Sequence, residues 1–267
     1  MSESFPMTQT SKLLNDILTK TSAVRAAGKA VLAVYDLDST LFDVQPRTEK
    51  ILRDFADLPE AIALDPENAK LLRQIKTEHS DWGIRTAIER AGIHTKNPAL
   101  VSLARTFWID KFFSNEYLVY DQPFPGSLSF VQSMVDLGAD FIYLTGRARE
   151  KMESGSIEVL RKHGFPLSDN NSELVMKPST AVEDFKFKEQ WFVELPKDKY
   201  DMIWFFENEP LNIEKVRVAH PEVQLVFFDS THSGRVPPPE GIPAIKDFLF
   251  EPYSGLASPK HSAKPKK

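Results

Sequence analysis

A continuous apolar run, Ala-Val-Leu-Ala-Val-Tyr at residues 30–35, ends directly in the polar stretch Asp-Leu-Asp-Ser-Thr at residues 36–40. A strand that is covered on both faces has no side facing solvent, so its sequence is apolar throughout. We therefore predict a central strand of a parallel sheet here, with Asp36 and Asp38 just beyond its carboxyl end. Open α/β sheets place their ligands at that edge.

Four further apolar runs have the same character and lie at residues 141–144, 174–176, 202–206 and 223–228. Helical sequence separates these four runs from one another. Strands that alternate with helices favour a parallel sheet with helices on both of its faces. The predicted fold class is therefore α/β with a doubly wound parallel sheet, preceded by a lead-in helix at about residues 9–27.

The interval between residues 41 and 122 breaks this alternation, because it contains no run typical of a buried strand. Its apolar residues favour several helices instead, at residues 49–55, 69–75, 84–90 and 100–113. We interpret the interval as an inserted all-α cap domain. The predicted domains are a discontinuous core at 1–40 and 123–250, a helical cap at 41–122, and a flexible basic tail at 251–267.

The composition excludes several classes of protein. The 267 residues carry a formal net charge of −5, so no global positive field favours nucleic acid as a partner. No cysteine is present, which excludes a thiolate nucleophile and cysteine-bound zinc. No apolar run approaches the roughly 20 residues that span a bilayer, and the N-terminal sequence does not look like a secretory signal. We expect no membrane partner and a cytoplasmic location.

Asp36 and Asp38 are the candidate chemical centre. Residues two apart in an extended chain point to the same side, so both carboxylates can face one substrate. A strand-end Asp can attack phosphorus and form an aspartyl-phosphate, while the second acid handles the proton. Two acids so close repel each other unless a divalent cation offsets their charge, and Mg²⁺ prefers hard oxygen ligands. We therefore predict Mg²⁺ as the cofactor.

The stretch Tyr-Asp-Leu-Asp-Ser-Thr-Leu-Phe-Asp at residues 35–43 resembles the first motif of the haloacid dehalogenase superfamily, D-x-D-x-T followed by an apolar residue. Ser39 stands where that motif commonly has glycine, at the backbone bend after Asp38. The stretch Phe-Ile-Tyr-Leu-Thr-Gly-Arg at residues 141–147 resembles the second motif. The resemblance covers residues 30–230 and implies a Rossmannoid core with a type-1 helical cap. It also implies phosphatase activity, with Thr145 and Gly146 donating hydrogen bonds to a phosphoryl oxygen at the start of the next helix.

The third motif of this superfamily is a lysine that neutralises the transferred phosphoryl group and the nucleophile. Three lysines are candidates by position, namely Lys177, Lys186 and Lys188. The superfamily often has Phe-Lys followed by a charged residue and an apolar helix, and residues 187–195 fit that arrangement best. The resemblance therefore favours Lys188, then Lys186, then Lys177.

The fourth motif is an acidic pair that completes the metal site at the end of the fourth strand. Here that strand ends in Glu207-Asn208-Glu209, so Asn208 stands where a ligating Asp is usual. An amide oxygen can bind a hard cation but supplies no charge, and we expect weaker metal affinity. The predicted metal ligands are Asp36, Asp38, Asn208 and Glu207.

The resulting hypothesis is a Mg²⁺-dependent hydrolase that cleaves a phosphomonoester of a small metabolite, with Asp36 as nucleophile and Asp38 as general acid and base. A cap over the site excludes water and large substrates. Two alternatives stay open. A phosphomutase or phosphotransferase shares all of these residues, and a weakly active or non-catalytic binding protein is compatible with Asn208. The sequence leaves the oligomeric state open.

Overall fold

The computed structural model describes residues 8–93, 97–196 and 198–251. Its main sheet has six parallel strands in the order β5-β4-β1-β6-β7-β8. The strands are β1 (Val31–Tyr35), β4 (Asp140–Ala148), β5 (Leu174–Lys177), β6 (Met202–Glu207), β7 (Gln224–Phe228) and β8 (Ala244–Ile245). All five apolar runs predicted as strands are confirmed. The short β8 at the sheet edge was not predicted.

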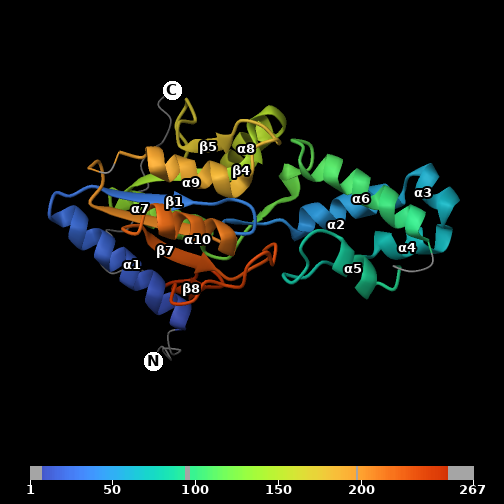
Figure 1. The fold of residues 1–267 in the computed structure, drawn as a ribbon, viewed down its shortest axis with the longest axis horizontal. Helices are drawn as coiled ribbons and strands as arrows, with labels where there is room; N and C mark the ends of the chain where they lie inside the picture. The colour runs from blue at the N-terminus through green and yellow to red at the C-terminus, as the bar shows by residue number, and fades with distance from the viewer. Residues whose placement is uncertain (1–7, 94–96, 197, 252–267) are drawn as a thin grey trace, which may run out of the picture.

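Helices cover both faces of this sheet (Figure 1). The helices α1 (Gln9–Ala26), α7 (Ser127–Asp136) and α8 (Arg149–Lys162) share one apolar cluster with Val31, Ala33 and Tyr35 of β1. The helices α9 (Asp184–Glu194) and α10 (Pro210–Ala219) share another with Leu32 and Val34. Successive side chains of a strand point to opposite faces, so both faces of β1 are buried. This is why its sequence is continuously apolar, and the predicted doubly wound α/β class is confirmed.

The helical insert gathers beyond one end of the sheet (Figure 1). Two short strands lead into and out of it, β2 (Phe42–Asp43) and β3 (Gln122–Pro123), which pair antiparallel as a neck. Its elements are α2 (Gln45–Ala56), α3 (Pro59–Leu64), α4 (Pro66–Arg73), α5 (Arg85–Arg90), α6 (Pro98–Phe112) and the 3₁₀ turn η1 (Leu118–Tyr120). Leu52, Phe55, Ile88 and Leu100 belong to an apolar cluster of its own. Helix α3 was not predicted.

The backbone bends sharply between β1 and the neck. Ser39 adopts φ +60°, a left-handed conformation that L-residues other than Gly, Asn and Asp rarely adopt. The bend is fixed by the Ser39 N–H, which donates to the carbonyl of Phe42 at 2.8 Å. It turns the chain away from the sheet while leaving Asp36 and Asp38 at the sheet edge.

Gly126 is required where the chain re-enters the core before α7. Its φ is +80°, and a Cβ atom there would lie 2.2 Å from the backbone oxygen of Phe248. We expect Gly126→Ala to lower the free energy of unfolding by more than about 2 kcal/mol, because it combines a left-handed strain with a backbone clash. Urea denaturation measures the change. Gly28→Ala is the matched control, since Gly28 has φ +76° with open space around it. An equal loss of unfolding free energy in both variants would show that the Cβ clash with Phe248 does not contribute.

The predicted basic tail at 251–267 lies outside the described residues, apart from Glu251. Within the described part of the chain, none of the helices combines the length and apolar character needed to cross a bilayer.

Candidate active site

Asp36 lies at the carboxyl end of β1 and continues the ladder toward β6. Its N–H donates to the carbonyl of Phe206 at 3.0 Å, which holds the residue in extended conformation. The residue is 4% exposed, and its Oδ1 accepts a hydrogen bond from Lys188 Nζ at 2.6 Å. Among the described residues, none donates a hydrogen bond to Asp36 Oδ2. One oxygen is thus fixed and the other is free to react.

Lys188 reaches Asp36 from the second turn of α9. Its ammonium, 2% exposed, also lies 2.7 Å from Glu207 Oε2 and 3.8 Å from Asp184 Oδ2. Burial lowers the pKa of Lys188, but attraction to Asp184, Asp36 and Glu207 outweighs it, so the pKa lies well above its usual value. Burial raises the pKa of Asp36 and of Glu207, and Lys188 opposes this only in part. One ammonium therefore faces three carboxylates, and the centre has an excess of negative charge.

The other two lysine candidates lie elsewhere. Lys186 is exposed and its ammonium lies 5.9 Å from the centre of the Phe185 ring. Lys177 ends β5, which is separated from β1 by β4. The structure thus brings only Lys188 of the three into contact with Asp36.

Glu207 accepts hydrogen bonds through both of its carboxylate oxygens. Its Oε1 accepts the backbone N–H groups of Asn208 and Glu209 at 2.9 and 2.8 Å. Its Oε2 accepts Lys188 and the side-chain amide of Asn212, the latter at 3.1 Å. Both carboxylate oxygens of this fully buried residue are engaged, and Glu207 is a counter-ion of Lys188; its predicted role as a metal ligand stays a prediction.

Asn208 is held with its amide oxygen toward the loop after β1. Its Oδ1 accepts the hydroxyl of Thr40 at 3.1 Å, while its Nδ2 donates to the carbonyl of Thr231. Because a carbonyl can only accept, the second contact fixes which end of the amide carries nitrogen. An oxygen that accepts one hydrogen bond retains a lone pair for a cation.

Asp38 is held by two arginines through a single oxygen. Its Oδ1 accepts Arg47 Nη2 at 2.6 Å, Arg147 Nη2 at 2.6 Å and Arg147 Nε at 3.1 Å. Burial raises the pKa of Asp38, but Arg147 and Arg47 outweigh this, so the pKa lies well below its usual range. Guanidinium groups therefore match the charge of this carboxylate at Oδ1, and its predicted role as a metal ligand stays a prediction. Its side chain is 28% exposed.

Asp121 completes this arrangement. Its Oδ1 accepts Arg47 Nε and its Oδ2 accepts Arg147 Nη2, both at 2.8 Å. Burial raises the pKa of Asp121 to about 6, although both arginines act against this. Asp38, Arg47, Asp121 and Arg147 form what we call the arginine–aspartate cluster. Sequence reasoning missed the roles of Arg47 and Asp121, because 74 positions separate them and neither stands in a recognisable motif.

Thr145 and Gly146 lie in β4 beside β1. The prediction that they begin a helix is wrong, because β4 continues through Ala148 and α8 starts at Arg149. The Thr145 Oγ1 accepts the N–H of Arg147 at 3.2 Å, which leaves its hydroxyl hydrogen available. A Cβ atom on Gly146 would lie 2.1 Å from Asp184 Oδ1, so a larger residue fits there only if the Asp184 side chain shifts. Asp184 was not predicted, although it stands one helical turn before Lys188.

The donor set around Asp36 can be tested for its fit to Mg²⁺. Over residues 8–93, 97–196 and 198–251, no three acidic, His or Cys side chains group in a way that could hold a metal ion. Within the described chain, two donors nevertheless retain a lone pair, Asp36 Oδ1, which accepts only Lys188 Nζ, and the amide oxygen of Asn208, which accepts only the Thr40 hydroxyl. The excess of carboxylates around Lys188, and a buried Asp184 Oδ1 with no hydrogen-bond partner among the described residues, both favour an added cation. The residues therefore fit a Mg²⁺ ion that takes its other ligands from water and a substrate phosphate.

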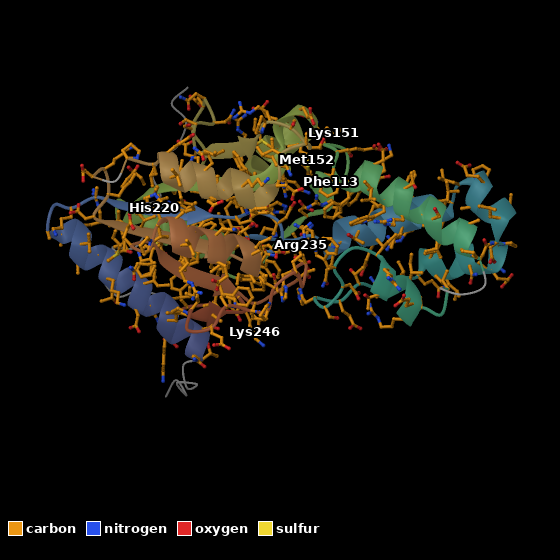
Figure 2. All side chains as sticks on the ribbon, in the orientation of Figure 1. Phe113, Lys151, Met152, His220, Arg235 and Lys246 are labelled. Atoms are coloured by element: carbon orange, nitrogen blue, oxygen red, sulfur yellow. The ribbon has the colours of Figure 1, made fainter. Side chains whose placement is uncertain are left out.

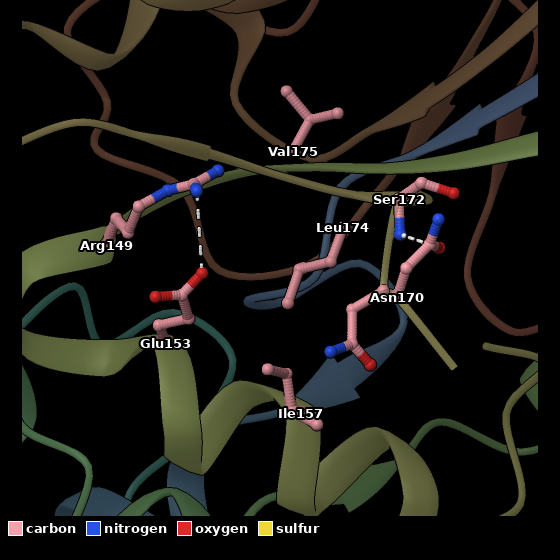
Figure 3. A pocket seen from close by; sticks show the side chains of 8 residues that line it. Arg149, Glu153, Ile157, Asn170, Ser172, Leu174 and Val175 are labelled. Atoms are coloured by element: carbon pink, nitrogen blue, oxygen red, sulfur yellow. Dashed lines mark hydrogen bonds and ion pairs between the residues drawn. The ribbon is translucent and has the colours of Figure 1, made fainter. Parts of the chain in front are cut away.

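Two cavities lie near this edge of the molecule. One of about 260 Å³ lies at the outer edge of β5, between Arg149, Glu153, Leu174 and Asn170 (Figure 3). Arg149 and Glu153 form an ion pair at 3.5 Å, so this cavity offers no free charge to a ligand. The other, of about 360 Å³, lies between the insert and the core. It is lined by His79, Ser80, Phe124, Asp229, Ser230 and Lys246.

Comparisons with known proteins concern the fold. No family model and no curated protein sequence matches the chain. Among solved structures, protein tyrosine kinase A from Mycobacterium tuberculosis is 11% identical, with 81% of this chain and 93% of that chain covered and a TM-score of 0.49. A hydrolase from Streptococcus pneumoniae TIGR4 is 16% identical, with 76% and 94% covered and a TM-score of 0.46.

A third solved structure, from Bacteroides fragilis, is described as a haloacid dehalogenase-like hydrolase. It is 13% identical, with 76% of this chain and 89% of that chain covered and a TM-score of 0.46. Fold likeness does not carry activity, so the function has to be argued from the side chains around Asp36.

Proposed function

We propose that the protein is a Mg²⁺-dependent phosphohydrolase of the haloacid dehalogenase type that acts on a small phosphorylated metabolite. The observation that carries this proposal is the Asp36–Lys188 contact at 2.6 Å, which fixes one carboxylate oxygen and leaves the other free. A carboxylate with one oxygen held by a buried ammonium is oriented for attack on phosphorus. Asp38, two residues away, is the proton carrier.

The reaction has two displacements. Because the arginines keep Asp38 ionised, it first takes a proton from the bound phosphomonoester monoanion. Asp36 Oδ2 then attacks phosphorus, the bond from phosphorus to the leaving oxygen breaks, and Asp38 passes that proton to the leaving oxygen. Water then attacks the aspartyl-phosphate while Asp38 takes a proton from it. The bond from phosphorus to Asp36 breaks, Asp38 passes its proton to the departing phosphate, and both side chains return to their ionised starting states. Asp38 acts through Oδ2, since its Oδ1 is occupied by the arginines.

Three residues and a metal ion would support the transferred phosphoryl. Lys188 keeps a positive charge beside Asp36, while Thr145 and Gly146 would donate hydrogen bonds. The Mg²⁺, held by Asp36 and Asn208, would offset the charge of the phosphoryl oxygens. Two of the predicted metal ligands, Asp38 and Glu207, are left out of this set because arginines and Lys188 engage their carboxylates.

The space between the insert and the core limits the size of the substrate. The 360 Å³ cavity joins the insert loop at His79 and Ser80 to Ser230 and Lys246 of the core. Ser230 also donates to the carbonyl of Ser39, so this cavity borders the loop that bears the two acids. Its lining does not include Asp36, Asp38 or Lys188, so it supports a small substrate only as space beside the reacting groups.

The experiment that tests the proposal is phosphate release from a panel of phosphomonoesters, sugar phosphates and nucleotides, with Mg²⁺ and with EDTA. Mg²⁺-dependent release of inorganic phosphate supports hydrolysis. Transfer of the phosphoryl group to a second sugar instead of water would identify a mutase or transferase. No turnover on any substrate, together with no Mg²⁺ binding in calorimetry, would overturn the enzyme proposal and leave a binding protein.

Asn208→Asp tests whether the amide limits metal binding. We expect about tenfold tighter Mg²⁺ binding in calorimetry, because a second carboxylate adds charge next to Asp36. Without metal the variant should melt below the wild type, since a further anion joins three carboxylates, and Mg²⁺ should raise its Tm more. Asn170→Asp, in the exposed loop before β5, is the matched control. Unchanged Mg²⁺ affinity in Asn208→Asp would remove Asn208 from the metal site.

A further inference from the structure

We propose that Arg47, a side chain of the helical insert, is the positioning residue of Asp38, so that the acid–base group is correctly placed only when the insert is seated on the core. This inference rests on the proposed function and adds a residue that no motif predicts. It makes the insert a part of the reacting site as well as its cover.

Arg47 and Arg147 divide the Asp38 carboxylate into a held oxygen and a free one. The three hydrogen bonds that the two arginines donate to Asp38 all go to Oδ1, at 2.6, 2.6 and 3.1 Å. Among the described residues, none donates to Oδ2. A carboxylate whose one oxygen is held from two directions cannot rotate freely about its side-chain bonds. The position of its second oxygen is then fixed relative to the substrate.

Arg47 is attached to other residues of the insert and moves with it. It lies in the first turn of α2, its Nη1 donates to the carbonyl of Phe112 at 3.1 Å, and its guanidinium carbon lies 4.1 Å from the centre of that ring. Helix α6, which carries Phe112, is tied to α2 by Trp108 Nε1, which donates to Thr48 Oγ1 at 3.3 Å. Figure 2 shows Phe113, the next residue, where α6 meets the core. A movement of the insert therefore moves Arg47.

Arg147 belongs to the core. It follows Gly146 in β4, and its Nη1 donates to Ser156 Oγ of α8 at 3.2 Å. Asp121, on the segment that returns from the insert, bridges the two guanidinium groups. Asp38 is thus held from the core by Arg147 and from the insert by Arg47. Displacing the insert removes one of the two holds and leaves the other in place.

The experiment measures phosphate release from the best substrate of the panel, using the full chain. We expect Arg47→Ala to lower kcat by about 10²-fold with KM changed less than threefold, since a misplaced proton carrier affects the transition state and not substrate binding. Arg47→Lys should recover part of the loss, and added guanidinium ion should partly rescue Arg47→Ala.

A double-mutant cycle with Asp38→Asn separates positioning from a structural role. If Arg47 acts through Asp38, Arg47→Ala should cost less than about threefold in kcat when Asp38→Asn is already present. Equal costs in both backgrounds, or no rescue by guanidinium ion, would overturn the proposal.

Arg90→Ala is the matched control for stability of the insert. Arg90 also pairs with a buried carboxylate there, since its Nη2 lies 2.5 Å from Asp81 Oδ2, and it likewise donates to a backbone carbonyl. We expect this variant to lower the Tm while kcat stays within threefold of the wild type below the transition. A loss of kcat in Arg90→Ala as large as that in Arg47→Ala would overturn the inference.

A wild-type protein that releases no phosphate defeats the proposed function and the inference together, whereas a fully active Arg47→Ala variant defeats the inference alone.

Discussion

Asp36→Asn is expected to reduce kcat by at least about 10³-fold, because an amide oxygen is a poor nucleophile and cannot form the aspartyl-phosphate. The substitution preserves the size of the side chain and an acceptor for Lys188 Nζ, which now lies 2.6 Å from Oδ1. The loss is therefore one of chemistry and not of local packing. KM for the substrate should change little, since the phosphoryl-binding donors stay in place.

The same substitution is expected to keep or raise the Tm. Lys188 faces the carboxylates of Asp36, Glu207 and Asp184, so one ammonium meets three negative groups. Removing one of these charges relieves repulsion, and active sites commonly trade stability for activity in this way. A large fall in Tm would indicate that Asp36 is a structural counter-ion of Lys188.

Phosphate release and differential scanning calorimetry measure the two effects in the same preparation. Asp43→Asn is the matched control, since Asp43 lies in the same motif but its Oδ1 accepts the N–H of Gln45 at the start of α2. It should retain kcat within about threefold, as a residue away from the transferred group. Retained activity in Asp36→Asn would exclude Asp36 as the nucleophile.

Lys188→Met is expected to lower kcat by about 10²–10³-fold, the usual cost of removing one electrostatic donor from a preorganised site. It should also lower the free energy of unfolding by about 3–5 kcal/mol, because Asp36 and Glu207 stay buried without their cation. Rates are therefore measured well below the new Tm, and Lys188→Arg serves as a second variant that keeps the charge.

The destabilisation should depend on pH with a defined sign. Burial already raises the pKa of Asp36 and Glu207, and loss of Lys188 raises both further. The folded variant then binds protons that the unfolded chain has released, so its stability falls as pH rises from about 4 toward 8. If the free energy of unfolding of Lys188→Met increased over that pH range, Asp36 and Glu207 would not be unpaired carboxylates in the variant.

Lys186→Met is the control for charge and helix composition. Lys186 is exposed on the same helix, two positions earlier, and its ammonium lies beside the ring of Phe185. We expect kcat and Tm to stay near the wild-type values. If Lys186→Met and Lys188→Met lost equal activity, the contact with Asp36 would not explain the effect.

Local sequence was sufficient to predict the sheet and the position of Asp36 at its edge. The run at residues 30–35 is apolar at every position because both faces of β1 are buried, and Asp36 follows at the edge where parallel strands end. Lys188 was ranked first among the lysines by its resemblance to the superfamily's third motif, and in the structure it lies on the buried side of α9. Ser39 was placed at a bend, and its φ of +60° agrees.

Sequence failed where a contact joins segments far apart or where a strand runs past its apolar part. The polar end of β4, from Thr145 to Ala148, was taken for the start of a helix, although pairing with β5 extends it. The bonds of Glu207 to Lys188 and Asn212 could not be predicted, because they depend on how α9 and α10 lie against β6.

The sequence by itself determined the α/β class, the helical insert and the two acids at the end of β1. Only the tertiary structure decided what surrounds them. Arg47 and Asp121 stand at opposite ends of the insert, and their meeting with Asp38 depends on how the neck seats the insert on the core. The physical reason is that the spacing of apolar residues in the sequence indicates only which side of one helix or strand is buried. The direction of a charged side chain is set by partners that only folding brings within reach.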